Sequence, residues 1–484
     1  MTPDPIYPSW FKIGGRCADE RCSVNRLISR CVVLGLLAFL PRTGEAQTSA
    51  GLGSPCRAGQ YGHSGFLLVC SDAGTFRYAL HEDVPPAPDG GYVERPAWYP
   101  TLASVFRTTD APQCPLSGRV TFTSPVIRPE DLIVTVPQGM VVSDHVTPID
   151  HGYIGVKGLG KPRASRTEDD YVRITAPADA EVIEVSSLGS PTSMRVVLAH
   201  GCDTYSVYMV VNRLSGALAH LQDDVQRGGR PAVRGLRILA GEEFGMQRDN
   251  PLDFSVHDGA SWLPGFLSPF AYTSSDSWKP YTVGPWPYFT PELGAFYESK
   301  MQRVAAPRWG VIDQDVAHTA MGNWFLDGTV GYSGRSVEAV RSATTPLMGG
   351  PFDGKNSPAW SHLSFLRHWV QPGRFVMSIG WWRDERGDPA QFLVDARPGQ
   401  PDPAQLTFDS GVVVYRLRTW SSSPGLNNES PAPIGYDLVP GPLVLGLVAV
   451  QVNADDTLTI ETIPGAQDPA TFKGFTTSKR TYRR

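Results

Sequence analysis

The chain has 484 residues, 41% of them hydrophobic, which is enough for two or three folded domains. Its 43 Lys and Arg against 48 Asp and Glu give a formal net charge of -5, and no long basic run suggests nucleic-acid binding. The 49 Gly and 43 Pro residues are scattered along the chain and indicate many short strands joined by tight turns, so we expect a mainly β protein.

The N-terminal segment has the pattern of a signal peptide. Arg26 and Arg30 precede an apolar run at 31–40, and small residues follow up to Ala46. This run of about ten residues is too short to cross ~30 Å of hydrocarbon as a helix, so we expect no permanent membrane anchor. We expect residues 1–46 to be cleaved near Ala46 and the protein to be secreted or periplasmic.

The cysteines that follow this leader suggest disulfides, because an exported chain folds in an oxidising compartment. They are Cys56, Cys70, Cys114 and Cys202. Cys56 and Cys70 are spaced for a hairpin, which would leave Cys114 to pair with Cys202. Three pairings are possible on paper, and buried free thiols are the alternative.

Residues 47–114 are expected to form a small cysteine-containing β module. Short apolar strands are predicted at 65–69 and 75–78, and a proline-rich linker lies at 84–88. The module is too short to bury much of a core without help from the rest of the chain.

Residues 115–275 contain more regular strands. Their alternating apolar and polar residues predict an antiparallel sheet packed on one face. The expected strands are 132–136, 171–174, 181–186, 195–198, 206–211 and 252–256.

An aromatic, proline-rich linker is expected at 276–306, with a short helix that begins at Thr290-Pro291-Glu292 and is capped by Thr290. Residues 307–484 are expected to form a C-terminal β domain, either a sandwich or barrel-like. Its predicted strands are 374–379, 411–417, 443–452 and 457–462.

A succession of short motifs runs through the central domain. They are His145 with Asp150, then 175–182, 204–208, 241–245 and 252–256. In this order they resemble the lysostaphin/LytM-type zinc endopeptidases, which cut peptidoglycan cross-bridges. That family carries HxxxD, an APxxGxV hairpin, a YxHL strand, a Gly-rich turn and a closing HxHFE strand. The resemblance implies a LytM-like fold for the central domain.

The resemblance also implies zinc ligands at His145, Asp150 and Asp253, because a catalytic zinc takes three protein ligands and a water. Two departures stand out. Four residues separate His145 from Asp150 where the family has three, and Asp253 stands where the family has histidine. A set of two carboxylates and one imidazole suits zinc less well than histidines do.

The acid-base positions of the family are also changed. Pro251 takes the place of the first histidine of HxH, and Asn212 lies near the place of the YxHL histidine. Without these groups nothing obvious activates a zinc-bound water. The histidines that could act instead are the catalytic candidates His151 and His257, and also His200 and His220.

Asp253 is the most informative of these residues, because a carboxylate at an inward strand position needs a partner or a raised pKa. If His145 is that partner, the old metal position would hold an Asp-His pair. The alternative for His145 and Asp150 is a structural hydrogen bond that fixes the loop around Pro148.

These motifs favour a secreted protein with a degenerate lysostaphin-type domain that no longer cuts but binds cell-wall peptide or glycan, or a protein partner. One alternative is an active zinc metalloendopeptidase that uses His145, Asp150, Asp253 and a recruited histidine. The other is an exported β protein whose C-terminal domain binds a small ligand.

Several other signals have simpler readings. Asp313, Asp315 and His318 have the residue types of metal ligands but fit a solvated turn better. Arg386-Gly387-Asp388 fits a turn between strands. Asn428-Glu429-Ser430 is a formal glycosylation sequon. The C-terminal tryptophans form either a sugar-binding face or core; they are Trp360, Trp369, Trp381 and Trp382.

Overall fold

The computed structural model describes residues 51–107, 113–116, 118–347, 357–383, 386–420 and 438–484. The expected signal peptide at 1–46 and the sequon at Asn428 lie outside these residues. The structure is mainly β, with several antiparallel sheets. Within the described ranges, no helix is both long and apolar enough to cross a membrane.

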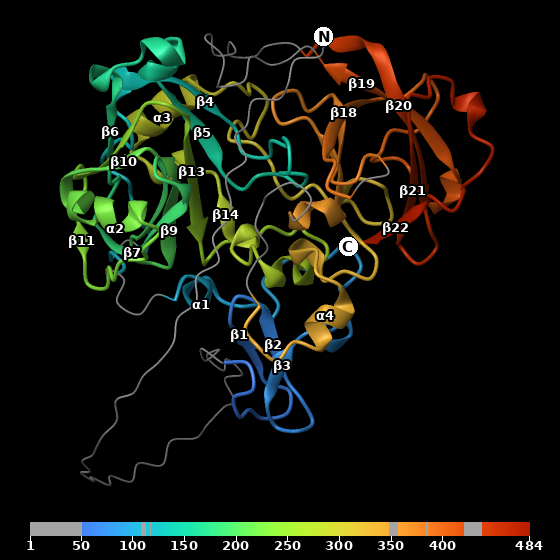
Figure 1. Ribbon diagram of the computed structural model, residues 1–484, viewed down its shortest axis with the longest axis horizontal. Helices are drawn as coiled ribbons and strands as arrows, with labels where there is room; N and C mark the ends of the chain where they lie inside the picture. The colour runs from blue at the N-terminus through green and yellow to red at the C-terminus, as the bar shows by residue number, and fades with distance from the viewer. Residues whose placement is uncertain (1–50, 108–112, 117, 348–356, 384–385, 421–437) are drawn as a thin grey trace.

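Three bodies of β structure pack together (Figure 1). The central sheets, drawn in green, lie on one side of the view, and a barrel drawn in orange and red lies on the other. A small blue sheet lies below both, beside the helix α4 (Val337–Arg341).

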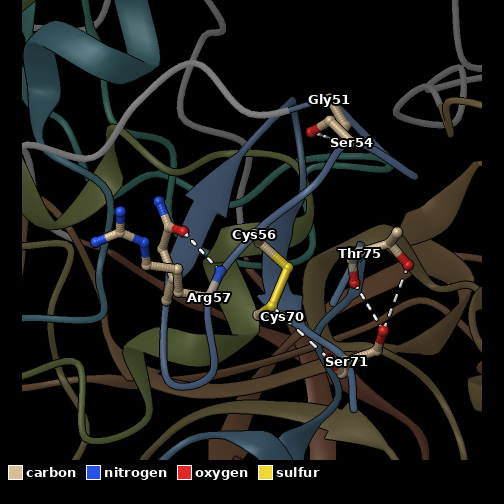
Figure 2. Close-up of a disulfide and its surroundings, with 8 residues drawn as sticks. Gly51, Ser54, Cys56, Arg57, Cys70, Ser71 and Thr75 are labelled. Atoms are coloured by element: carbon tan, nitrogen blue, oxygen red, sulfur yellow. Dashed lines mark hydrogen bonds between the residues drawn. A yellow bond between two sulfur atoms is a disulfide. The ribbon is translucent and has the colours of Figure 1, made fainter. Parts of the chain in front are cut away.

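The N-terminal sheet has three antiparallel strands, β1 (Tyr61–His63), β2 (Leu67–Cys70) and β3 (Phe76–Tyr78). The expected disulfides are present, and they join Cys56 to Cys70 and Cys114 to Cys202. Figure 2 shows how the first one ties the loop before β1 to the end of β2, next to hydrogen bonds between Ser71 and Thr75. This cross-link holds together a module that has little core of its own.

The central domain is built on an eight-stranded sheet. Its strands run in the order β11 (Arg237–Ile238), β7 (Ala180–Ser190), β8 (Ser193–Ala199), β9 (Thr204–Val211), β13 (Leu252–Asp258), β5 (Gly152–Val156) and β4 (Leu132–Val136), and β14 (Thr282–Val283) pairs with β13. A second, three-stranded sheet packs with it in the order β10 (Arg213–Leu214), β12 (Glu243–Gln247) and β6 (Val172–Thr175). The large core between them includes Phe244, Phe254 and Tyr208.

Helices are short and lie in the connections. In the part of the chain that the structure describes, the α-helices besides α4 are α1 (Leu102–Phe106), α2 (Gln222–Gln226) and α3 (Pro291–Ser299). The helix expected at Thr290 is therefore present as α3, with Pro291 at its first position. The expected cap is wrong in one respect, because the Thr290 side chain makes no capping hydrogen bond.

The C-terminal domain is a closed barrel of eight antiparallel strands. They are β15 (Gly322–Leu326), β16 (His362–Arg367), β17 (Phe375–Ile379), β18 (Ala390–Asp395), β19 (Val413–Trp420), β20 (Pro440–Val452), β21 (Leu458–Pro464) and β22 (Arg480–Arg483). Alternate residues of these strands form one buried cluster that includes Trp324, Phe365, Tyr415 and Tyr482. The interior is thus filled by side chains, as in other small barrels.

The outside of the barrel packs against the central domain. Leu366, Val376 and Leu393 form a hydrophobic cluster with Val141 from the loop that follows β4. Beside it, the Gln391 side chain accepts a hydrogen bond from the Ser143 backbone N–H and donates one to the Ser143 carbonyl. This contact fixes the loop that carries His145, Asp150 and His151.

Candidate functional site

Asp253, Ser255 and His257 lie on one face of β13. The residues that alternate with them, such as Phe254, belong to the central hydrophobic core. Successive side chains of a strand point to opposite faces, so the polar residues face away from this core. All three polar residues are nevertheless buried, because the loop before β5 and the segment around Trp278 cover them.

His151 lies between two carboxylates. Its Nδ1 is 3.0 Å from Oδ1 of Asp150, and its Nε2 is 3.5 Å from Oδ2 of Asp253. The strand register explains this placement: Tyr153 of β5 pairs with Asp253 of β13, and His151 immediately precedes β5. Asp150, His151 and Asp253 together form what we call the Asp-His-Asp cluster.

Trp278 closes the cluster on one side. Its indole N–H donates a hydrogen bond to Oδ2 of Asp150 at 2.5 Å. Phe106 of α1 stacks on the indole with ring centroids 6.2 Å apart, and the Arg195 guanidinium lies 5.2 Å from the same ring. The three cluster residues expose only 4–8% of their surface.

The two carboxylates have opposite pKa shifts. Burial alone would raise the pKa of Asp150, but the hydrogen bond and charge of His151, together with the charge of Lys279, hold it well below the usual range. Burial raises the pKa of Asp253 to about 7, against the attraction of His151 and with the repulsion of Asp150. Asp150 therefore carries the negative charge of the cluster, and Asp253 holds a proton up to about neutral pH.

His145 lies beside this cluster. Its ring centroid is 6.3 Å from that of His151, and its backbone closes a tight hairpin with Val142. Burial lowers its pKa to about 3, assisted by the charges of His151 and Lys279. Of the expected ligands, the structure thus brings Asp150 and Asp253 together around His151, and it is His151 that faces Asp253.

Two of the three expected zinc ligands, Asp150 and Asp253, contact His151, which was not one of the expected ligands. Among the residues that the structure describes, no group of three His, Cys, Asp or Glu side chains is arranged to hold a metal ion. Zinc binding stays a prediction that only metal analysis tests.

The other candidate bases serve as hydrogen-bonding groups or lie apart. His257 contacts two hydroxyl groups, Ser255 Oγ at 3.0 Å and Thr282 Oγ1 at 3.2 Å. His200 lies 2.7 Å from Ser206 Oγ. Burial lowers the pKa of both histidines to about 4, so both stay neutral at pH 7. His220 is exposed on the surface.

A buried lysine next to the cluster was not expected from the sequence. Lys279 is almost fully buried, with its Nζ 3.3 Å from the hydroxyl of Tyr332 and 3.9 Å from Asp276. Burial lowers the pKa of Lys279 and raises that of Asp276. A single lysine inside an aromatic, proline-rich segment gives no periodic signal that would have revealed this pair.

Asp313, Asp315 and His318 do not share a site. Asp313 accepts a hydrogen bond from the Gly265 backbone, and Asp315 accepts from the backbones of Leu267 and Asn323. These two aspartates fix loops. His318 contacts different carboxylates, those of Asp89 and Asp456.

Two cavities of ligand size lie away from the cluster. One is a groove of about 570 Å³ beside Trp262, Tyr288 and Trp309. The other, of about 480 Å³, lies under the proline-rich segment at 84–92. The volumes suit small ligands or part of a chain. Neither is lined by a residue of the Asp-His-Asp cluster.

Comparisons with known protein families, with curated proteins and with solved structures found no match.

Proposed function

We propose that this chain is an exported binding protein that recognises cell-wall glycan or peptide without cutting it. The observation that supports this proposal is the closed Asp-His-Asp cluster at the position where the motifs place a peptidase site. In the proposal its residues stabilise the domain instead of acting on a substrate.

Burial is the physical argument against catalysis. A peptidase must bring the scissile carbonyl within hydrogen-bond reach of its acid-base groups, directly or through one water. Here the indole N–H of Trp278 is hydrogen-bonded to Oδ2 of Asp150, and the His151 ring lies between the two carboxylates. A substrate would have to displace both side chains and break the hydrogen bonds that join them to Asp150.

The two disulfides support export. Disulfides persist in secreted and periplasmic proteins and are rare where thiols are kept reduced. Cys114–Cys202 joins residues 88 positions apart, so it constrains a large loop of the unfolded chain. The expected cleavage near Ala46 fits this proposal.

The test is a sedimentation and digestion assay on the purified mature protein. The protein is mixed with insoluble peptidoglycan, the pellet is assayed for bound protein, and the supernatant for newly released amino groups. The zinc content is measured on the same sample. We expect binding in the pellet, no release above the blank and far less than one zinc per chain.

Asp253→Asn serves as the matched variant. Amino-group release that disappears in this variant, together with one zinc per chain in the parent, would establish the metallopeptidase instead. Protein that stays entirely in the supernatant would refute cell-wall binding.

A further inference from the structure

We infer that the groove beside Trp262 and Trp309 binds an uncharged carbohydrate chain. This inference rests on the proposed cell-wall binding and assigns it a place and a ligand class. The groove, called the aromatic groove below, has a volume of about 570 Å³ and runs from β14 to the segment at 307–313. It is large enough for two or three sugar rings, given that ligand sites span roughly 300–1,000 Å³.

Trp309 provides one wall of the aromatic groove. A Cβ placed on Gly284 would lie 2.3 Å from the indole ring, so the indole lies directly against the backbone of that glycine. The Trp309 carbonyl accepts a hydrogen bond from the Gln138 backbone and anchors the residue. The ring is packed on one side and lines the groove while remaining partly exposed.

Trp262 provides a second aromatic surface. Its indole N–H donates to the carbonyl of Tyr92 at 3.0 Å, and the rings of Tyr99 and Tyr281 meet it edge-on. These contacts hold the ring in one orientation while part of its surface stays open. Fixed aromatic faces suit sugars, because the C–H groups of a pyranose are weakly positive and pack flat on the electron-rich ring.

Polar groups among the lining residues complete the chemistry. Gln138, Ser261 and Asp313 line the aromatic groove and can exchange hydrogen bonds with sugar hydroxyls. A few placed polar groups among aromatic rings are what orient a ligand in such a site.

Charge selects among carbohydrates. Of the residues that line the groove, Asp313 is acidic and none is Lys or Arg. Arg119 is close to Tyr288, but its guanidinium packs on that ring at 4.5 Å and donates to the Pro287 carbonyl, and it does not line the groove. A sugar carboxylate or phosphate would therefore find no basic side chain among the lining residues, which disfavours acidic chains.

The experiment measures binding of the mature protein to chitohexaose and cellohexaose by calorimetry, and to polygalacturonate as the acidic chain. Binding to insoluble peptidoglycan is measured by sedimentation. We expect binding to at least one uncharged hexamer and none to polygalacturonate. Trp309→Ala should weaken binding by at least about tenfold, as aromatic anchors of binding sites commonly do.

Two variants separate the site from general damage. Phe408→Ala removes an exposed aromatic side chain of the C-terminal domain that does not line the groove, so it should leave sugar binding unchanged. Gly284→Ala keeps Trp309 but forces its indole to move, and it should weaken binding too. Thermal unfolding of each variant confirms that it is folded.

The outcomes are distinct. If the parent protein binds peptidoglycan and folded Trp309→Ala binds it equally well, the aromatic groove is the wrong place and the proposed function stands. Binding to polygalacturonate as tight as to the hexamers would overturn the choice of uncharged chains. A parent protein that binds none of the hexamers overturns the inference, and if peptidoglycan also fails, the proposed function falls with it.

Discussion

Asp150 and Asp253 differ in what surrounds their oxygens. Asp150 accepts the indole N–H of Trp278 and lies within hydrogen-bond distance of His151, whereas His151 approaches Asp253 only to 3.5 Å. Hydrogen bonds to an ionised carboxylate stabilise its charge, and burial without them favours the neutral acid. One proton therefore stays on Asp253, which keeps two buried charges from facing each other.

The raised pKa of Asp253 predicts a pH effect on stability. Burial raises this pKa from 3.8 to about 7, so the folded protein binds the proton more tightly than the unfolded chain does. The stabilisation is complete below about pH 4 and is lost as the pH rises through 7, at up to about 1.4 kcal/mol per pH unit. Asp253→Asn cannot ionise, so its stability relative to the parent should be higher at pH 8 than at pH 5.

Urea unfolding at the two pH values checks this expectation. Asp169→Asn, at an exposed carboxylate of the same domain, should show the same difference from the parent at both. A pH-independent effect of Asp253→Asn would mean that Asp253 is ionised throughout.

Trp278 should matter through its N–H group. Trp278→Phe keeps an aromatic ring next to Phe106 but removes the donor to Asp150. Because that acceptor is charged and buried, we expect a loss of about 1.5–3 kcal/mol of unfolding free energy. Trp262→Phe, which removes a donor to the neutral Tyr92 carbonyl, should cost less, about 0.5–1.5 kcal/mol. Equal losses in chemical denaturation would contradict a charged Asp150.

At the scale of strands, runs of apolar and alternating residues predicted where strands lie. The strand predicted at 132–136 has the bounds of β4, and the strand at 252–256 is the start of β13. The sequence left a sandwich and a barrel-like C-terminal domain open, and it did not predict the strand that closes the barrel. Its last strand, β22, has the sequence Arg-Thr-Tyr-Arg, which has little strand pattern of its own. It forms a strand because its backbone pairs with β15 on one side and β21 on the other.

The candidate site was predictable in part for the same reason. The inward position of Asp253 follows from the alternation of β13, and so does its need for a partner. The identity of the partner depends on the pairing of β5 with β13, which sets His151 next to Asp253. His145 is held in its own tight hairpin with Val142, a local turn that the spacing of the motifs does not predict.

Tyr482 of β22 gives a test of the closing strand. Its ring is buried in the barrel, and its hydroxyl makes no hydrogen bond within the part of the chain that the structure describes. Removing an unsatisfied buried hydroxyl should not destabilise, so Tyr482→Phe should be neutral or stabilising by about 1 kcal/mol. Tyr415→Phe removes a hydroxyl that donates to the Pro401 carbonyl at 2.8 Å and should cost about 1 kcal/mol. Thermal unfolding compares the two, and a loss in Tyr482→Phe as large as in Tyr415→Phe would contradict this placement.

Over the whole molecule, hydrophobic clusters join the three β bodies, although the barrel interior forms a cluster of its own. One hydrophobic cluster combines Phe76 of the N-terminal sheet, Tyr205 of the central sheet and Val340 of α4. The hydroxyl of Tyr78 also accepts a hydrogen bond from the Leu347 backbone. The small N-terminal module is thus completed by its neighbours, and we expect the folded chain to respond to pH as one unit.

Histidines with lowered pKa values set the acid side of that response. Burial lowers the pKa of His63, His200 and His257 to about 4, and that of His145, His362 and His368 to about 3. A lowered pKa means that the unfolded chain binds the proton more tightly, so the stabilisation is complete above pH 6.5 and is lost as the pH falls towards 3–4. Asp253, with a pKa of about 7, and Asp315, with a pKa of about 6, act in the opposite direction as the pH rises.

Stability should therefore peak near neutral pH and fall steeply on the acid side. Each neutral buried histidine contributes up to about 1.4 kcal/mol per pH unit to the slope. Urea unfolding from pH 8 to pH 4.5 measures this slope as the number of protons taken up on unfolding. His63→Gln, at a partly exposed position, should lower the uptake by one proton, whereas His220→Gln at the surface should leave it unchanged. An unfolding free energy that stays level between pH 7 and pH 5 would show that the folded protein takes up as many protons as the unfolded chain, so that these histidines titrate alike in both states.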